Sequence, residues 1–64
     1  MTTQVQEYQA KSQQHHRNAA QYEKDATNYL AMGNESKAID CMVLADDHWN
    51  SVTYYQTLIA NILH

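Results

Sequence analysis

The sequence predicts an all-α protein built as one two-helix antiparallel hairpin. Proline is absent, and the single glycine, Gly33, stands almost at the midpoint of the 64 residues. Glycine and proline are the strongest interrupters of regular structure, so one interruption predicts two long elements. On each side of Gly33, apolar and aromatic residues recur at alternating spacings of three and four, which is typical of a helix with one buried stripe. Residues 1–64 are therefore expected to form a single helical-hairpin domain.

The first helix is expected over about residues 4–31. Thr3, followed by Gln6 three residues later, forms a capping-box pattern that favours a helix start at this point. The buried stripe of this helix is expected to contain Val5, Tyr8, Ser12, His15, Ala19, Tyr22, Ala26 and Tyr29.

The turn is expected at about residues 32–35 and the second helix at about 36–63. Gly33 can adopt the left-handed conformation that ends a helix, and the Asn34 side chain can accept a hydrogen bond from the first amides of the next helix. The segment 52–55 also has a composition that suits a strand, but no other segment could pair with it. The stripe of the second helix is expected to contain Ala38, Cys41, Ala45, His48, Val52, Tyr55, Ile59 and Ile62.

The second helix is apolar over more of its circumference than one partner helix can cover. A chain of this length buries only about 60% of its unfolded surface, and a single cysteine, Cys41, excludes an intramolecular disulfide. Small scaffolds of this kind are often stabilised by association. We therefore expect a homodimer that forms a four-helix assembly. Its interface is expected to contain Trp49, Val52, Tyr55, Leu58, Ile59 and Ile62.

The charge balance bears on the class of partner. Four basic against seven acidic residues give a formal charge of −3, and the basic residues are scattered. Nucleic-acid binders carry a basic face, so we expect no nucleic-acid partner. The N-terminus lacks a secretory-signal pattern, and no apolar stretch approaches the roughly 20 residues that span a bilayer; we expect a cytoplasmic protein with no membrane partner. A face for a basic protein partner is predicted at Glu35, Asp40, Asp46 and Asp47.

The histidines and the cysteine are the candidate sites of chemistry in this sequence. Cys41 and His48 share a stripe but lie roughly 10 Å apart along the helix, whereas a nucleophile and its base need about 3 Å. The hairpin register places His15 and His48 about one turn out of step, so a shared metal site would also need a carboxylate such as Asp47. We expect no catalytic residue, no metal and no cofactor, and therefore no enzyme. The alternative is a metal- or ligand-binding helical bundle that uses these histidines.

Two resemblances add to this interpretation. The segment 22–45 resembles a single tetratricopeptide-type helical hairpin; Asn50 replaces the closing proline of that repeat and no second copy follows, so the resemblance implies a hairpin and not a peptide-binding solenoid. The residues that carry it are Tyr22, Ala26, Tyr29, Gly33, Ala38 and Ala45.

The segments His15-His-Arg-Asn-Ala-Ala20 and Gly33-Asn-Glu-Ser-Lys-Ala38 resemble small proteins of the early region of lambdoid bacteriophages, between the exonuclease and excisionase genes. This second resemblance implies an all-helical dimer that influences lytic versus lysogenic development. We therefore expect a small, non-enzymatic accessory or regulatory protein. It is expected to act by protein–protein interaction with an unidentified host or phage protein in the host cytoplasm.

Overall fold

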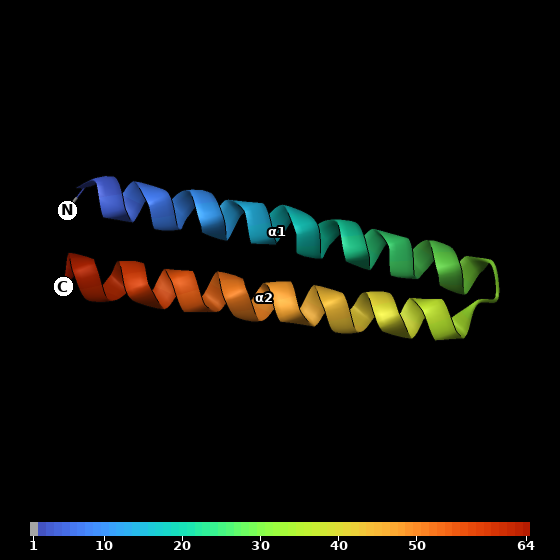
Figure 1. Ribbon diagram of the computed structural model, residues 1–64. Coiled ribbons are helices and arrows are strands. Elements are labelled where there is room, and N and C mark those ends of the chain that lie inside the picture. The colour runs from blue at the N-terminus through green and yellow to red at the C-terminus, as the bar shows by residue number, and fades with distance from the viewer. Residues whose placement is uncertain (1) are drawn as a thin grey trace.

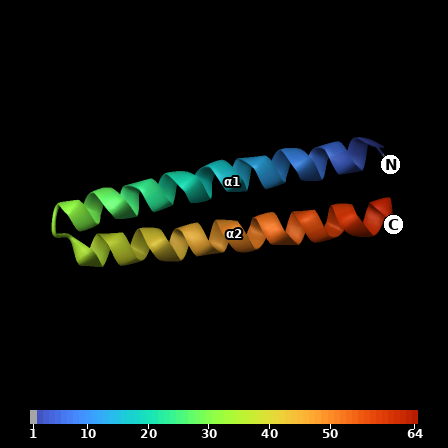
Figure 2. The same ribbon diagram turned by 180° about the vertical axis from the view of Figure 1, so that it is seen from behind.

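The computed structural model describes residues 2–64 as two long helices, α1 (Thr2–Ala31) and α2 (Glu35–Leu63). Figure 1 shows them side by side and antiparallel, with both chain ends at one end of the hairpin and the turn at the other. The view from behind shows no further element against either face of the described chain (Figure 2). The Cα atoms extend over 48 × 14 × 11 Å. The predicted all-α hairpin is confirmed for these residues; Met1 lies outside them.

The start of α1 differs from the sequence prediction. The helix begins at Thr2, so Thr3 is a helical residue and the predicted capping position is wrong. No glycine or proline precedes Gln4. Nothing in residues 2–4 therefore interrupts the helix.

The turn between the helices is formed by two residues with different roles. Gly33 has φ of 77°, a left-handed conformation that glycine adopts without steric cost. Its amide donates to the Leu30 carbonyl at 3.0 Å, and the Asn34 amide donates to the Tyr29 carbonyl at 2.8 Å. This pair of bonds is the Schellman motif that closes a helix. The Asn34 side chain then accepts from the Lys37 amide at 3.2 Å, so the same residue also caps α2.

The contact between the helices is made by small residues at intervals of seven. We call this set the alanine seam. Because the described chain contains only two helices, its buried side chains are covered by the opposite helix. Ala19 and Ala38 are fully inaccessible, and no large side chain is fully buried. The seam consists of Ser12, Ala19 and Ala26 in α1 and Ala38, Ala45 and Val52 in α2.

The segment 52–55 is helical, as the absence of a pairing strand predicted. The threonines in and just after this segment donate hydrogen bonds to carbonyl groups of the preceding turn. The Thr53 hydroxyl donates to the Trp49 carbonyl at 3.2 Å, and the Thr57 hydroxyl donates to the Thr53 carbonyl at 2.9 Å. Threonine can therefore satisfy its hydroxyl without leaving the helix.

Candidate functional site

Five rings from the two helices form a continuous stack along one side of the alanine seam, and we call this set the ring ladder. Its members alternate between α1 and α2 because residues at intervals of seven on each helix project between those of the other. The ring centroids are 5.8 Å, 5.8 Å, 5.0 Å and 5.6 Å apart in succession. In order along the hairpin the ladder consists of Tyr8, Tyr55, His15, His48 and Tyr22.

The centre of the ladder is a direct contact between two histidines. Nδ1 of His15 lies 2.7 Å from Nδ1 of His48, and the contact is partly buried. A hydrogen bond between two imidazole nitrogens requires one N–H donor and one lone-pair acceptor, so the two rings hold different protonation patterns at Nδ1. The ring of His15 also stacks on Tyr55, with 15° between the planes, and that of His48 stacks on Tyr22, with 14°.

The sequence register placed these two histidines one turn out of step, and that expectation is wrong. That register paired each residue of the first helix with a single position of the second helix. In an antiparallel pair, a side chain lies between two positions of the facing helix that are one turn apart. The His15 ring therefore lies between His48 and Tyr55 of α2.

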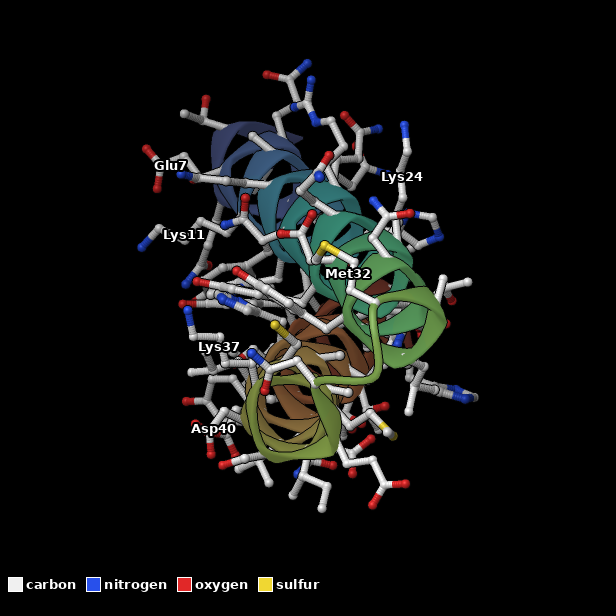
Figure 3. All side chains as sticks on the ribbon, turned by 90° about the vertical axis from the view of Figure 1, so that its right-hand side faces the viewer. Glu7, Lys11, Lys24, Met32, Lys37 and Asp40 are labelled. Atoms are coloured by element: carbon white, nitrogen blue, oxygen red, sulfur yellow. The ribbon has the colours of Figure 1, made fainter. Side chains whose placement is uncertain are left out.

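One lysine lies beside the ladder, and a second lies beside Tyr29, which is outside the ladder. The Lys11 ammonium is 5.8 Å from the centroid of the Tyr55 ring, and the Lys37 ammonium is 5.6 Å from that of Tyr29. Figure 3 shows both lysines projecting on the same side of the hairpin, whereas Lys24 projects on the opposite side. These distances permit cation–π attraction, so the side of the hairpin that carries the ladder is also flanked by positive charge.

The opposite side of the seam carries the single tryptophan. The indole N–H of Trp49 donates to the Glu23 carboxylate. The same ring meets His16 edge-on, with centroids 4.9 Å apart and an interplanar angle of 89°. Trp49 therefore joins α2 to α1 within one chain while keeping part of its surface accessible.

The outward face of α2 combines exposed apolar and acidic side chains around one valine. Val43 is 55% exposed. Ile39 and Asp40 lie four and three residues before it, and Asp46 and Asp47 lie three and four residues after it. Side chains at these spacings are adjacent on a helix surface. We call this set the Val43 patch; it consists of Ile39, Asp40, Val43, Asp46 and Asp47, all exposed.

The two helices differ sharply in charge. Three acidic and three basic side chains balance in α1, whereas α2 carries four acidic side chains and one basic, so the formal charge of −3 belongs to α2. Of the predicted acidic face, three aspartates lie in the Val43 patch. Glu35 lies apart from them in the first turn of α2, where a carboxylate interacts favourably with the helix N-terminus.

The residues predicted for a dimer interface do not share one surface of the hairpin. Val52 is only 6% exposed because it belongs to the alanine seam. Tyr55 lies in the ring ladder, whereas Trp49 lies on the opposite side. Leu58, Ile59 and Ile62 are half-buried towards the end of α2.

Large exposed apolar side chains also occur outside the predicted interface. Their exposed fractions range from 41% to 72%. They are Leu30, Met32, Ile39, Met42, Val43, Leu44, Tyr54 and Leu63.

The remaining candidate groups stay separate. Cys41 is a half-buried free thiol, one heptad from His48 on the same helix. Asp47 is exposed in the Val43 patch and does not join the histidine pair. Within residues 2–64, no three side chains of the histidine, cysteine, aspartate and glutamate types come together as a metal-ion site. No helix in the same range is long and apolar enough to cross a membrane.

No protein-family model matches this chain, and neither a curated protein nor a solved structure matches it.

Proposed function

We propose that the chain is a small non-enzymatic regulatory or accessory protein of bacteriophage type that works as a homodimer through protein–protein contacts. The observation that carries the proposal is the composition of the core. Its buried apolar residues are four alanines and one valine, while eight large apolar side chains are exposed. A seam of four alanines, one serine and one valine supplies little hydrophobic stabilisation, so association is the natural source of the remainder.

The accessible surface of the hairpin supports association. The chain exposes 4756 Å², whereas a compact monomer of this mass is expected to expose about 4,200 Å². The excess arises because a two-helix hairpin has no third layer. Covering each hairpin with a second copy would bury apolar surface at the end of α2, where Leu58, Ile59 and Ile62 remain half-exposed.

The Val43 patch is the proposed contact surface for a further protein. An exposed apolar side chain surrounded by three carboxylates is complementary to an apolar pocket with a basic rim. Charge complementarity of this kind raises the association rate and selects the partner, whereas buried apolar anchors supply most of the affinity. In this proposal the partner is a host or phage protein in the cytoplasm, and the phage resemblance suggests a role in lytic versus lysogenic development.

Two pairs of variants test the two surfaces separately. Ile62→Asp is expected to lower the dimer fraction measured by sedimentation, whereas Asn61→Asp, at the exposed neighbouring position, should leave it unchanged. Val43→Lys is expected to abolish capture of a partner from host lysate. Asn50→Lys, one heptad further on the same exposed face, should retain it. A partner captured equally by both lysine variants, or a dimer indifferent to Ile62→Asp, would contradict the corresponding part of the proposal.

A further inference from the structure

We infer that the contact between His15 and His48 is a proton-sensitive clasp, which holds α1 to α2 while the pair carries at most one added proton and opens when it takes a second. The two Nδ1 atoms are 2.7 Å apart. Of two facing nitrogens at this distance, one must present a lone pair, because two N–H groups cannot point at each other.

The proton count follows from the imidazole group. With both rings neutral, one carries its proton on Nδ1 and the other on Nε2. A first added proton can go to Nε2 of the donating ring, and the contact then becomes a charge-assisted hydrogen bond. A second proton has only the accepting Nδ1 to occupy. Its arrival removes the hydrogen bond and leaves two imidazolium rings whose centroids are 5.0 Å apart.

The surroundings offer no compensation for two positive charges. Tyr22 of α1 stacks on His48, and Tyr55 of α2 stacks on His15. Tyr8 and the Lys11 ammonium lie next to the Tyr55 ring. Two of these rings stack on the histidines and provide no carboxylate. The single charged group, Lys11, is itself positive. Asp46 and Asp47, which directly follow Ala45 in α2, belong to the exposed Val43 patch. No carboxylate clusters with both histidines in the described chain.

A metal ion fits the contact less well than a proton. Imidazole nitrogens lie about 2.0 to 2.1 Å from a bound zinc ion, so two of them around one tetrahedral ion stand more than 3 Å apart. The observed separation of 2.7 Å is shorter. The distance therefore describes a hydrogen bond and favours a proton as the species held between the rings.

The sign of the pH dependence follows from linkage. In the unfolded chain both imidazoles are free to take a proton, whereas the closed clasp has room for one. The unfolded state then binds more protons at acidic pH, and stability falls as the pH falls. One proton of difference raises the unfolding equilibrium constant by up to about tenfold per pH unit.

The first test compares this pH dependence between variants at a fixed protein concentration. Urea unfolding is followed from pH 7.5 to pH 5 for the wild type, for His15→Gln and for His16→Gln. Glutamine at position 15 can hydrogen-bond to His48 but carries no titratable group, so this variant should lose most of the pH dependence. His16 lies on the opposite side of the seam against Trp49, and its variant should keep the wild-type dependence. Equal dependence in His15→Gln and the wild type would overturn the inference.

A second test needs no variant. In protein labelled with ¹⁵N at the histidine rings, nuclear magnetic resonance should detect a coupling between the two Nδ1 nuclei across the N–H···N bond at pH 7. The coupling should be lost on titration to pH 5, as the pair takes its second proton. A coupling that persists unchanged at pH 5 would refute the clasp. The clasp would also be refuted if zinc raised the unfolding temperature only when His15 is present and unfolding showed no pH dependence.

Discussion

Replacement of Ala19 by leucine tests whether the alanine seam sets the distance between the helices. Ala19 is 0% exposed, so its methyl group is covered completely by α2. Leucine adds three carbons at this position. If the site had room, burying them would stabilise the fold by about 0.8 kcal/mol for each carbon. Since the methyl group is already enclosed, we expect the helices to separate or the side chain to adopt a poor rotamer, with a net loss of about 1 to 3 kcal/mol.

Ala20 provides the matched control because it is the next residue in α1 and is exposed. Alanine and leucine have similar helix propensities, so Ala20→Leu should change the free energy of unfolding by only a few tenths of a kcal/mol. A loss of 1 kcal/mol lowers the unfolding temperature of a domain of this size by about 4 to 8 °C. Circular dichroism during thermal and urea unfolding, at one protein concentration, measures the difference. If Ala19→Leu is as stable as Ala20→Leu, the seam does not pack as described.

Three further perturbations follow from the turn, its cap and the charge distribution. A Cβ at Gly33 would meet no atom within 4 Å, so Gly33→Val should lower the free energy of unfolding by roughly 1 to 3 kcal/mol through the positive φ alone. Gly33→Asn should lower it less, because asparagine tolerates this conformation. Equal stability of the two variants would contradict that explanation. Asn34→Ala removes the acceptor for the Lys37 amide and should cost about 1 kcal/mol, measured by urea unfolding; an unchanged value would show that the cap contributes nothing. The wild-type protein should give no gel shift with duplex DNA in low salt, since its formal charge is −3 per chain; tight, salt-sensitive binding would contradict the proposed protein partner.

The hairpin could be predicted from the sequence because its signals are local and agree with one another. One glycine between two stripes of period three and four determines two helices and the place of the turn. Gly33 and Asn34 have the conformational and hydrogen-bonding properties that the Schellman motif and the cap require. The start of α1 was missed by two residues because a threonine can cap a helix or lie within it, and the sequence near Thr3 does not distinguish these roles.

The histidine contact could not be derived from the stripes alone. Heptad spacing identified the helix face that carries His15 and His48 but not which two levels of the facing helix each ring reaches. That choice depends on how closely the helices approach, which the buried alanines determine. Similarly, Val52 was assigned to a dimer interface because it is apolar, whereas the close approach of the helices already buries it within one chain. The Val43 patch has a sequence signal, since apolar and acidic residues lie three and four positions from one valine, but its exposure becomes clear only once the inward face of α2 is known.

The proposal depends most on association of the hairpin with a second copy, because the buried apolar residues are four alanines and one valine while eight large apolar side chains are exposed. The most direct measurement is the mass of the wild-type protein in solution, by light scattering or sedimentation equilibrium at micromolar concentration and neutral pH. The account predicts a particle of twice the 7.4 kDa of one chain. A folded, helical particle with the mass of a single chain at that concentration would contradict it.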